Sequence, residues 1–203
     1  MIDSSEEKIS RNSEPEPKKQ KGFFRELLEL LIVALVVVVP FRLFIAQPFV
    51  VNGASMEPTF DNGEYLIVDQ LTYRFEPPER GEVLIFRFPK DPKKFFIKRL
   101  IGLPGETVTI SNGRVYIKNS EHPEGFAISE PYVSFIKRDN FTVTLEESEF
   151  FVLGDNRLGS ADSRLWGPLP VSLVVGRPII RLFPFTRIAL LPGDGSKTLR
   201  EQQ

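Results

Sequence analysis

The chain of 203 residues contains no cysteine and only one histidine, His122. The missing cysteines exclude disulfides, thiolate metal ligands and a cysteine nucleophile. A single histidine excludes a His-rich metal site, and we expect neither a metal nor a cofactor. His122 lies in the polar stretch Asn119–Gly125, which predicts a solvated loop. A Ser/His/Asp triad would have to use this loop residue, so a histidine general base is disfavoured.

The chain also lacks an excess of charge of either sign. It has 26 Lys and Arg against 27 Asp and Glu, for a net charge of -1. No global positive field attracts a polyanion, so we expect no nucleic-acid partner. Phenylalanine is abundant instead, with 18 residues against one Trp and four Tyr. Most should be core, and others should face a membrane or line an apolar groove.

Residues 1–22 contain almost no large apolar side chain, which predicts a disordered tail. The segment 23–46 that follows holds an apolar run in which the only charges after residue 26 are Glu29 and Arg42. About twenty helical residues span the apolar core of a bilayer, so we predict a single transmembrane helix. Two alternatives are a buried core helix and a cleaved signal peptide.

The sequence argues against both alternatives. A core helix should have a polar face, and Leu30–Val39 has none. A cleavage site should have a small residue at position -3, where cuts after Ala46 or Ala54 would place Phe44 or Asn52. Cleavage is therefore not expected.

The orientation of the anchor follows from its flanking charges. Lys18, Lys19, Lys21 and Arg25 precede the apolar core, whereas no Lys or Arg lies between Arg42 and Arg74. The positive-inside rule then places the N-terminus in the cytoplasm and the rest of the chain outside.

Residues 47–195 show short β-rich runs separated by turn residues, and 196–203 form a polar tail. We therefore predict a mostly β fold, in which the transmembrane helix precedes an antiparallel β-sheet domain. Ser111-Asn112-Gly113 predicts a hairpin turn. The candidate strands are Phe49–Val51, Tyr65–Val68, Val83–Phe88, Phe95–Ile101, Thr107–Ile110, Arg114–Ile117, Phe141–Leu145, Phe150–Leu153 and Arg177–Phe183.

The first cluster with chemical potential is Gly53–Thr59, which contains Ser55. Glycine and alanine before the serine leave space for a substrate backbone, and Pro58 fixes the chain direction behind it. These features are typical of an exposed nucleophile on a rigid turn. By composition alone, a plain turn is the alternative.

The second cluster is Phe95–Gly105, which contains Lys98. Strand alternation places Lys98 on one face with Phe96 and Leu100. Apolar neighbours disfavour a charged amine, and a lysine base needs its pKa lowered by roughly three units. The alternative is a lysine that extends into solvent from a strand edge.

The third cluster is the polar loop Gly154–Gly167. Asp155, Arg157, Asp162 and Arg164 within it can form two ion pairs that fix its shape. Its carboxylate and amide oxygens also suit a hard metal ion, although the interspersed arginines argue against a cation-binding loop.

Four boxes in this order closely resemble the bacterial type I signal peptidase family. Ser55–Thr59 (SMEPT) resembles its S-M-x-P-T box, and Gly63–Val68 (GEYLIV) resembles its G-D-x-x-x-V strand. Lys98–Glu106 (KRLIGLPGE) resembles K-R-x-x-G-x-P-G-D. Gly154–Arg164 (GDNRLGSADSR) is similar to G-D-N-R-x-x-S-x-D-S-R at every specified position.

The resemblance implies a serine–lysine dyad that works without histidine. By matching positions, Ser55 is the nucleophile, its N–H is one oxyanion donor, and Lys98 is the general base. Ser160 would hold the lysine amine by a hydrogen bond, and Asp162 and Arg164 would support the loop. The implied reaction is removal of signal peptides after Ala-x-Ala-like sites, through an acyl-enzyme, at the outer face of the plasma membrane. The implied partners are signal peptides of exported preproteins, the lipid bilayer and the protein-export machinery.

The chain departs from the family pattern at three positions. Glu64 and Glu106 replace aspartates, and we expect both to be structural. Gly53 stands where some members have a serine hydroxyl as second oxyanion donor, which rules out a side-chain donor there.

Two other functions remain as alternatives. A soluble self-cleaving protease of the repressor type would lack the anchor, and an inactive peptide-binding domain would not need the three clusters. Phe183-Pro184-Phe185 is a candidate for contact with the membrane surface. Candidates for the substrate pocket, each of which could instead be core, are Phe49, Val51, Met56, Phe60, Phe96 and Ile97.

Overall fold

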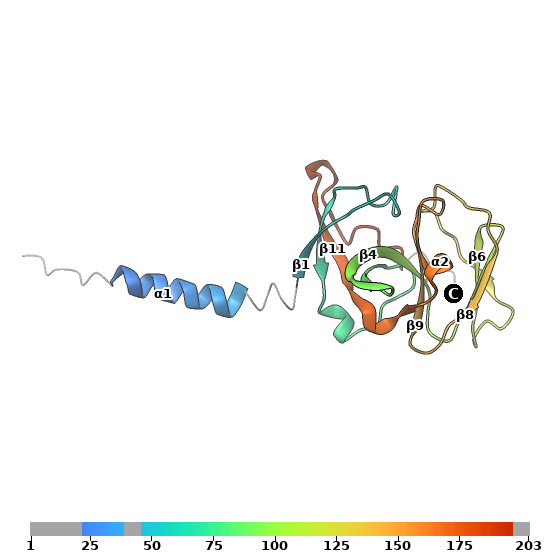
Figure 1. Cartoon of the computed structure of the whole chain (residues 1–203), viewed down its shortest axis with the longest axis horizontal. Coiled ribbons are helices and arrows are strands. Elements are labelled where there is room, and N and C mark those ends of the chain that lie inside the picture. The colour runs from blue at the N-terminus through green and yellow to red at the C-terminus, as the bar shows by residue number, and fades with distance from the viewer. Residues whose placement is uncertain (1–21, 39–45, 197–203) are drawn as a thin grey trace, which may run out of the picture. The chain divides into compact units, whose positions relative to one another are not determined.

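Short strands rich in Val, Ile and Phe occupy the region after residue 46, as the sequence pattern predicted (Figure 1). The computed structural model describes residues 22–38 and 46–196. The predicted tails, 1–22 and 196–203, lie outside the described residues except for Gly22 and Ser196, and so do residues 39–45 of the predicted anchor.

The strands are β1 (Ala46–Val50), β2 (Tyr65–Asp69), β3 (Val83–Phe88), β4 (Asp91–Gly102), β5 (Thr107–Ser111), β6 (Arg114–Lys118), β7 (Phe126–Ala127), β8 (Phe141–Thr144), β9 (Glu149–Leu153), β10 (Leu169–Pro170), β11 (Val174–Phe183) and β12 (Ala189–Leu190). The short helices among them are η3 (Thr72–Arg74), α2 (Ser163–Trp166), η4 (Val171–Leu173) and η5 (Phe185–Arg187).

All the paired strands are antiparallel, which confirms the predicted mostly β class. An eight-stranded sheet has the order β1-β2-β11-β3-β4-β9-β10, with β12 paired to β11. A second sheet has the order β7-β6-β5-β8. The predicted turn joins β5 to β6, with Asn112 at φ 50° and Gly113 at φ 81°. The sequence pattern missed β7, β10 and β12, because a two-residue strand has too few positions to show alternation.

The N-terminal segment is a separate unit. Its helix α1 spans Phe23–Val33 and continues as the π-helical η1 (Ala34–Val38). No residue of α1 is buried. Within the ranges that the structure describes, no helix is long and apolar enough to cross a membrane.

Strand β4 belongs to the first sheet, and the next strand along the chain, β5, belongs to the second. Its register against β9 shifts between Leu100 and Gly102, where the strand bends. A Cβ on Gly102 would lie 2.4 Å from Val108 Cγ2 and 2.9 Å from Phe151 Cβ. Only glycine allows the second sheet to approach this closely.

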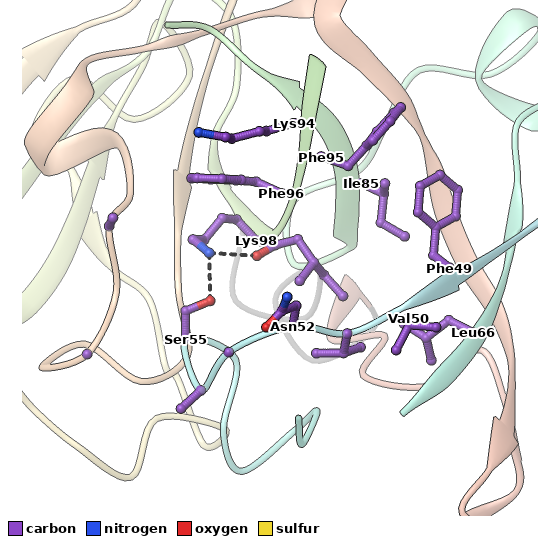
Figure 2. Close-up of a pocket in the computed structure, with 16 residues that line it drawn as sticks. Phe49, Val50, Asn52, Ser55, Leu66, Ile85, Lys94, Phe95, Phe96 and Lys98 are labelled. Carbon is purple, nitrogen blue, oxygen red and sulfur yellow. Dashed lines mark hydrogen bonds between the residues drawn. The ribbon is translucent and has the colours of Figure 1, made fainter. Parts of the chain in front are cut away.

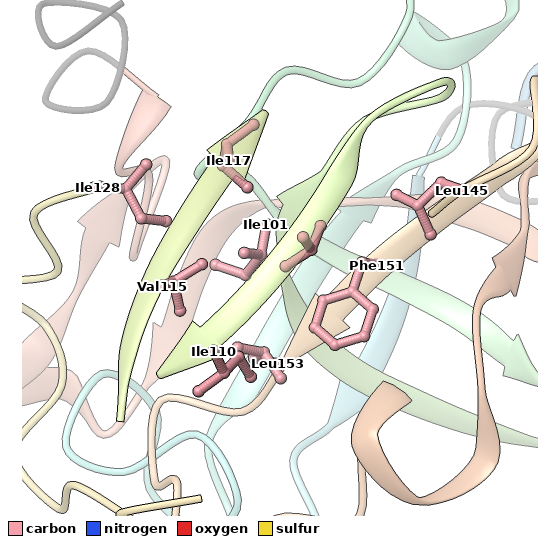
Figure 3. Packing of buried hydrophobic residues seen from close by; sticks show 9 residues of the cluster. Ile101, Ile110, Val115, Ile117, Ile128, Leu145, Phe151 and Leu153 are labelled. Atoms are coloured by element: carbon pink, nitrogen blue, oxygen red, sulfur yellow. The ribbon is translucent and has the colours of Figure 1, made fainter. Parts of the chain in front are cut away.

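The core between the sheets is a cluster of buried aliphatic side chains around Phe151 (Figure 3). Strands β4 and β9 contribute Ile101 and Leu153, and β5 and β6 contribute Val108 and Ile117. Lys98 therefore sits on a strand that also contributes Ile101 to the core that holds the two sheets together.

We expect Phe151→Ala to lower the free energy of unfolding by about 3–5 kcal/mol, because it leaves a cavity in this core. Urea denaturation of the full chain in detergent measures the loss. Phe75→Ala is the matched control, since Phe75 is 78% exposed and its removal should change stability by less than about 0.5 kcal/mol. Equal effects of the two substitutions would show that the cluster does not hold the sheets together.

Candidate active site

The side chains of Ser55 and Lys98 meet although they are 43 residues apart in the chain (Figure 2). Ser55 lies on the turn that follows β1, and Lys98 lies in β4. The distance from Lys98 Nζ to Ser55 Oγ is 2.7 Å. This distance allows direct proton transfer between the hydroxyl and the amine.

Lys98 is buried, with 3% of its surface exposed. Its amine lies 5.4 Å from the centre of the Phe96 ring and donates to Ile97 O at 2.8 Å. Burial lowers the pKa of Lys98 from 10.5 to about 8, against the carboxylates of Asp162 and Asp155, which raise it. A substantial fraction of this lysine is therefore neutral near pH 8.

Three hydrogen bonds hold the turn that carries Ser55. The N–H of Gly53 donates to Asn62 Oδ1 at 2.8 Å. Asn156 contacts the other side of the turn, where its N–H donates to Ser55 O and its Nδ2 donates to Ala54 O, both at 3.1 Å. The N–H of Ser55 itself has no acceptor within the part of the chain that the structure describes. It is therefore free to bind a substrate oxygen.

A buried ion pair joins the three sequence clusters. Arg99 Nε and Nη2 donate to the two carboxylate oxygens of Asp155 at 2.8 and 2.6 Å. Asp155 also accepts from Thr59 Oγ1 at 2.6 Å. The side chains of Arg99 and Asp155 are 1% and 0% exposed. Strand β4, the polar loop and the nucleophile turn are thus fixed to one another at a single carboxylate.

The polar loop is closed by Asp162 and Arg164, as predicted. Arg164 Nε and Nη2 each donate to Asp162 at 2.8 Å, and the N–H of Gly154 donates to Asp162 Oδ2 at 3.1 Å. Burial would raise the pKa of Asp162, but the hydrogen bonds and charge of Arg164 and the bond from Gly154 lower it. Asp162 is therefore ionised and held close to Lys98.

The second predicted ion pair within the loop is wrong. Asp155 pairs with Arg99, as described above, and Arg157 pairs with Glu130 at 2.5 Å. Both partners come from outside the loop, because buried charges take the partner that the fold brings into contact rather than the one nearest in sequence. No carboxylate of the loop is left without an arginine.

Comparisons with known proteins identify the family of the chain. Residues 24–183 match the family described as signal peptidase, peptidase S26. The chain belongs to this family of signal peptidases. As a member of the family, it is a serine peptidase.

Three relatives show how far the similarity extends. The probable signal peptidase I-1 of Synechocystis is 36% identical over 172 residues, which cover 81% of this chain and 85% of that protein. The signal peptidase I of Bacillus caldolyticus is 36% identical over 77% of this chain and 90% of its own. A crystal structure of a signal peptidase I from Enterococcus faecalis is 34% identical, covers 50% of this chain and 97% of that chain, and has a TM-score of 0.43.

The two glutamates that replace aspartates of the signal peptidase boxes are both buried beside arginines. Glu64 lies 3.0 Å from Arg181 and 3.0 Å from Arg187. Glu106 binds both terminal nitrogens of Arg80, at 2.7 and 2.6 Å. Both contacts are structural, as the sequence predicted.

The hydrogen bond predicted between Ser160 and Lys98 is absent. The hydroxyl of Ser160 is buried beside Gly154, where an added Cβ would lie 2.2 Å from Ser160 Oγ. The hydrogen bonds of the lysine amine go instead to Ser55 Oγ and to the carbonyl of Ile97. Matching Ser160 to a motif of the family therefore did not predict which nearby oxygen accepts the hydrogen bond of the lysine.

A cavity of about 570 Å³ opens beside the serine and the lysine. Of the predicted pocket residues, Phe49, Val51, Phe96 and Ile97 line it. The sequence analysis missed other lining side chains, which come from neighbouring strands and from the polar loop. These are Val50, Asn52, Leu66, Ile85, Lys94, Phe95 and Ala161.

Met56 and Phe60 do not line this cavity. They are 1% and 0% exposed and pack with Leu66 and Val68 beneath the nucleophile turn. An apolar residue beside a nucleophile box can face the pocket or the core, and the sequence alone does not distinguish the two.

His122 is half-buried rather than solvated, and its ring packs edge-on against Phe126 at 5.1 Å. It lies in the loop between β6 and β7 of the second sheet, whereas Lys98 lies in β4 of the first sheet and Ser55 on the turn after β1. The structure thus places the histidine apart from the serine.

We expect Asp155→Leu to destabilise the protein by about 3–5 kcal/mol, because it leaves the guanidinium of Arg99 buried without its carboxylate. Urea denaturation in detergent measures the change. Asp91→Asn is the control, since Asp91 forms a solvent-exposed pair with Lys94 that should contribute less than about 1 kcal/mol. A loss for Asp155→Leu no larger than that of the control would contradict the joining role of this carboxylate.

Proposed function

We propose that this signal peptidase family member is a membrane-bound endopeptidase that removes N-terminal signal peptides from exported preproteins, with Ser55 as nucleophile and Lys98 as general base. The single observation that carries the proposal is the 2.7 Å contact between Lys98 Nζ and Ser55 Oγ. The burial of Lys98 adds to it, because the amine must be neutral to accept a proton.

The reaction starts when the neutral amine of Lys98 takes the hydroxyl proton of Ser55. Oγ attacks the carbonyl carbon of the residue before the cleaved bond, and the carbonyl oxygen becomes an oxyanion that the N–H of Ser55 stabilises. The ammonium of Lys98 then gives its proton to the departing amine, which leaves an ester on Ser55. Lys98 next takes a proton from a water molecule that attacks this ester, and then returns the proton to Ser55 Oγ as the signal peptide leaves.

Cleavage after Ala-x-Ala-like sites suits the cavity beside the dyad. Val51, Phe96 and Ile97 give it apolar walls. Ala161 and Gly159 complete the wall on the side of the polar loop. Bulky walls exclude long side chains by steric clash and admit alanine.

We propose 23–46 as the membrane anchor, with 1–22 in the cytoplasm, and 47–195 as the catalytic domain on the outer face of the plasma membrane. The apolar side chains of α1 and η1 support the anchor, since Leu30 and Leu35 are 67% and 68% exposed. Lipid would cover such side chains. Lys18, Lys19 and Lys21 support the orientation.

The hairpin between β11 and β12 is a second proposed contact with the bilayer, next to which the export machinery would deliver preproteins. Phe183 and Phe185 are 45% and 78% exposed, and Leu190 is 78% exposed. Exposed apolar side chains gathered in one hairpin are typical of a surface that inserts into the interface of a membrane.

Ser55→Ala and Lys98→Met should each lower kcat/KM for a preprotein with an Ala-x-Ala site by roughly 10⁴-fold or more, because each removes one member of a unit that acts together. Purified full-length chain in detergent and a gel assay measure the loss. His122→Ala is the control and should keep the activity of the unsubstituted chain. An active Lys98→Met variant would exclude Lys98 as the general base. An inactive His122→Ala variant would indicate a mechanism that uses the histidine.

The rate should also depend on pH through Lys98. The pKa of this group is lowered to about 8, so the neutral base prevails above pH 8 and the ammonium prevails below it. We therefore expect kcat/KM to fall by roughly tenfold for each pH unit below 8 and to level off above it. A rate that stays flat from pH 9 down to pH 5 would contradict a lysine base.

A further inference from the structure

The cavity beside the dyad is lined by one basic side chain besides Lys98. Of the sixteen residues that line it, Lys94 and Lys98 are the only ones with an ionisable side chain. Figure 2 shows Lys94, Phe96 and Lys98 projecting from the same side of β4, with Lys94 at the end away from Ser55. A substrate chain that enters the cavity along β4 therefore meets a cation at a fixed distance from the reacting serine.

The charge of Lys94 is only weakly compensated. Its Nζ lies 3.2 Å from Asp91 Oδ2, and the two side chains are 68% and 38% exposed. Solvent screens an ion pair this exposed, so it holds the lysine loosely and leaves it able to pair with another anion.

The surrounding hairpin strengthens the positive potential. Arg87, Lys90 and Lys93 lie at or beside the tip of the β3–β4 hairpin and are exposed, whereas Asp91 is the only carboxylate between Arg87 and Lys94. The side chain of Arg87 is held in place by a cation–π contact, because its guanidinium lies over the Phe95 ring, 5.0 Å from the ring centre. Lys94 is the member of this basic group that lines the cavity.

The rise per residue of an extended chain indicates which substrate residue would contact Lys94. An extended chain advances about 3.3 Å per residue, so the four steps from Lys98 to Lys94 cover about 13 Å. The residue before the cleaved bond must lie beside Lys98, because its carbonyl is attacked by Ser55. An extended substrate running along β4 then places about the fifth residue before the bond beside Lys94.

We propose that Lys94 is a specificity-determining residue that favours an acidic side chain, and disfavours a basic one, at about the fifth residue before the cleaved bond. The inference rests on the proposed function, since it takes the signal-peptide half of the substrate to occupy the cavity. The chemical class that this end of the cavity selects is a carboxylate on an extended peptide.

The test uses one preprotein with Glu, Gln or Lys at the fifth position before the bond, cleaved by the full-length chain in detergent at low salt. Competition between substrates gives the ratio of kcat/KM values. We expect Glu to exceed Lys by roughly fivefold for the unsubstituted chain, because one unit charge acts at short range through water. The ratio should shrink toward one at high salt.

Charge substitutions assign the preference to one side chain. Lys94→Gln should remove the preference, and Lys94→Glu should reverse it. Lys93→Glu is the matched control, because Lys93 has the same charge on the same hairpin and does not line the cavity. Lys93→Glu should cleave the Gln substrate at the rate of the unsubstituted chain. Urea denaturation in detergent shows whether the two Lys94 variants are folded.

The outcomes separate the inference from the function on which it rests. If the unsubstituted chain fails to cleave the Gln substrate, the proposed function is wrong. If it cleaves all three substrates equally, or if Lys93→Glu changes the ratio as much as Lys94→Glu, the inference is overturned. A preference that appears only for charges after the bond would also overturn it, since the other half of the substrate would then occupy the cavity.

Discussion

The buried pair of Arg99 and Asp155 is the interaction on which the arrangement of the site depends. Asp155 belongs to the polar loop, Arg99 to β4, and the third partner, Thr59, to the nucleophile turn. Because Lys98 precedes Arg99 in the same strand, holding Arg99 on one face directs Lys98 to the other. The ring of Tyr132, which lies between β7 and β8, covers the pair, and its centre is 3.8 Å from the guanidinium. Anchoring one arginine therefore aligns a lysine and a serine that are far apart in the chain.

Burial and two nearby carboxylates have opposite effects on the pKa of Lys98. Asp155 and Asp162 both raise the pKa of Lys98 and would keep it protonated if they acted alone. Each carboxylate is instead bound by an arginine, Asp155 by Arg99 and Asp162 by Arg164. Desolvation then outweighs the remaining attraction, and the pKa of Lys98 falls to about 8. The ion pairs thus hold the loop in place, and the burial of Lys98 allows it to be neutral.

The sequence predicted the parts of the structure that depend on local pattern. A β-rich run predicted β3 with its observed ends, and Ser111-Asn112-Gly113 predicted a hairpin turn. The apolar face of β4 also placed Phe96 next to Lys98. Predictions that required the partner of a buried polar group were less successful. The bond from Ser160 to Lys98 is absent, and Arg157 pairs with Glu130, a residue that no motif singled out.

The pocket residues show the same limit. Phe49 and Ile97 line the cavity, whereas Met56 and Phe60 belong to the core, although all four lie in or next to the same strands and boxes. Burial against another apolar side chain and exposure to an apolar cavity leave the same pattern in a sequence. The selectivity of the cavity is therefore a property of the fold, in which β1, β4 and the polar loop surround one serine.

The central claim is that a buried, uncharged lysine acts on Ser55. Its most direct test is the titration of the Lys98 side chain by NMR, in the full-length chain labelled with ¹³C at lysine Cε and assigned by comparison with Lys98→Met. A midpoint at about 8 is expected, because burial lowers the pKa of this amine. A midpoint near 10.5, the ordinary value for a solvent-exposed lysine, would contradict the account.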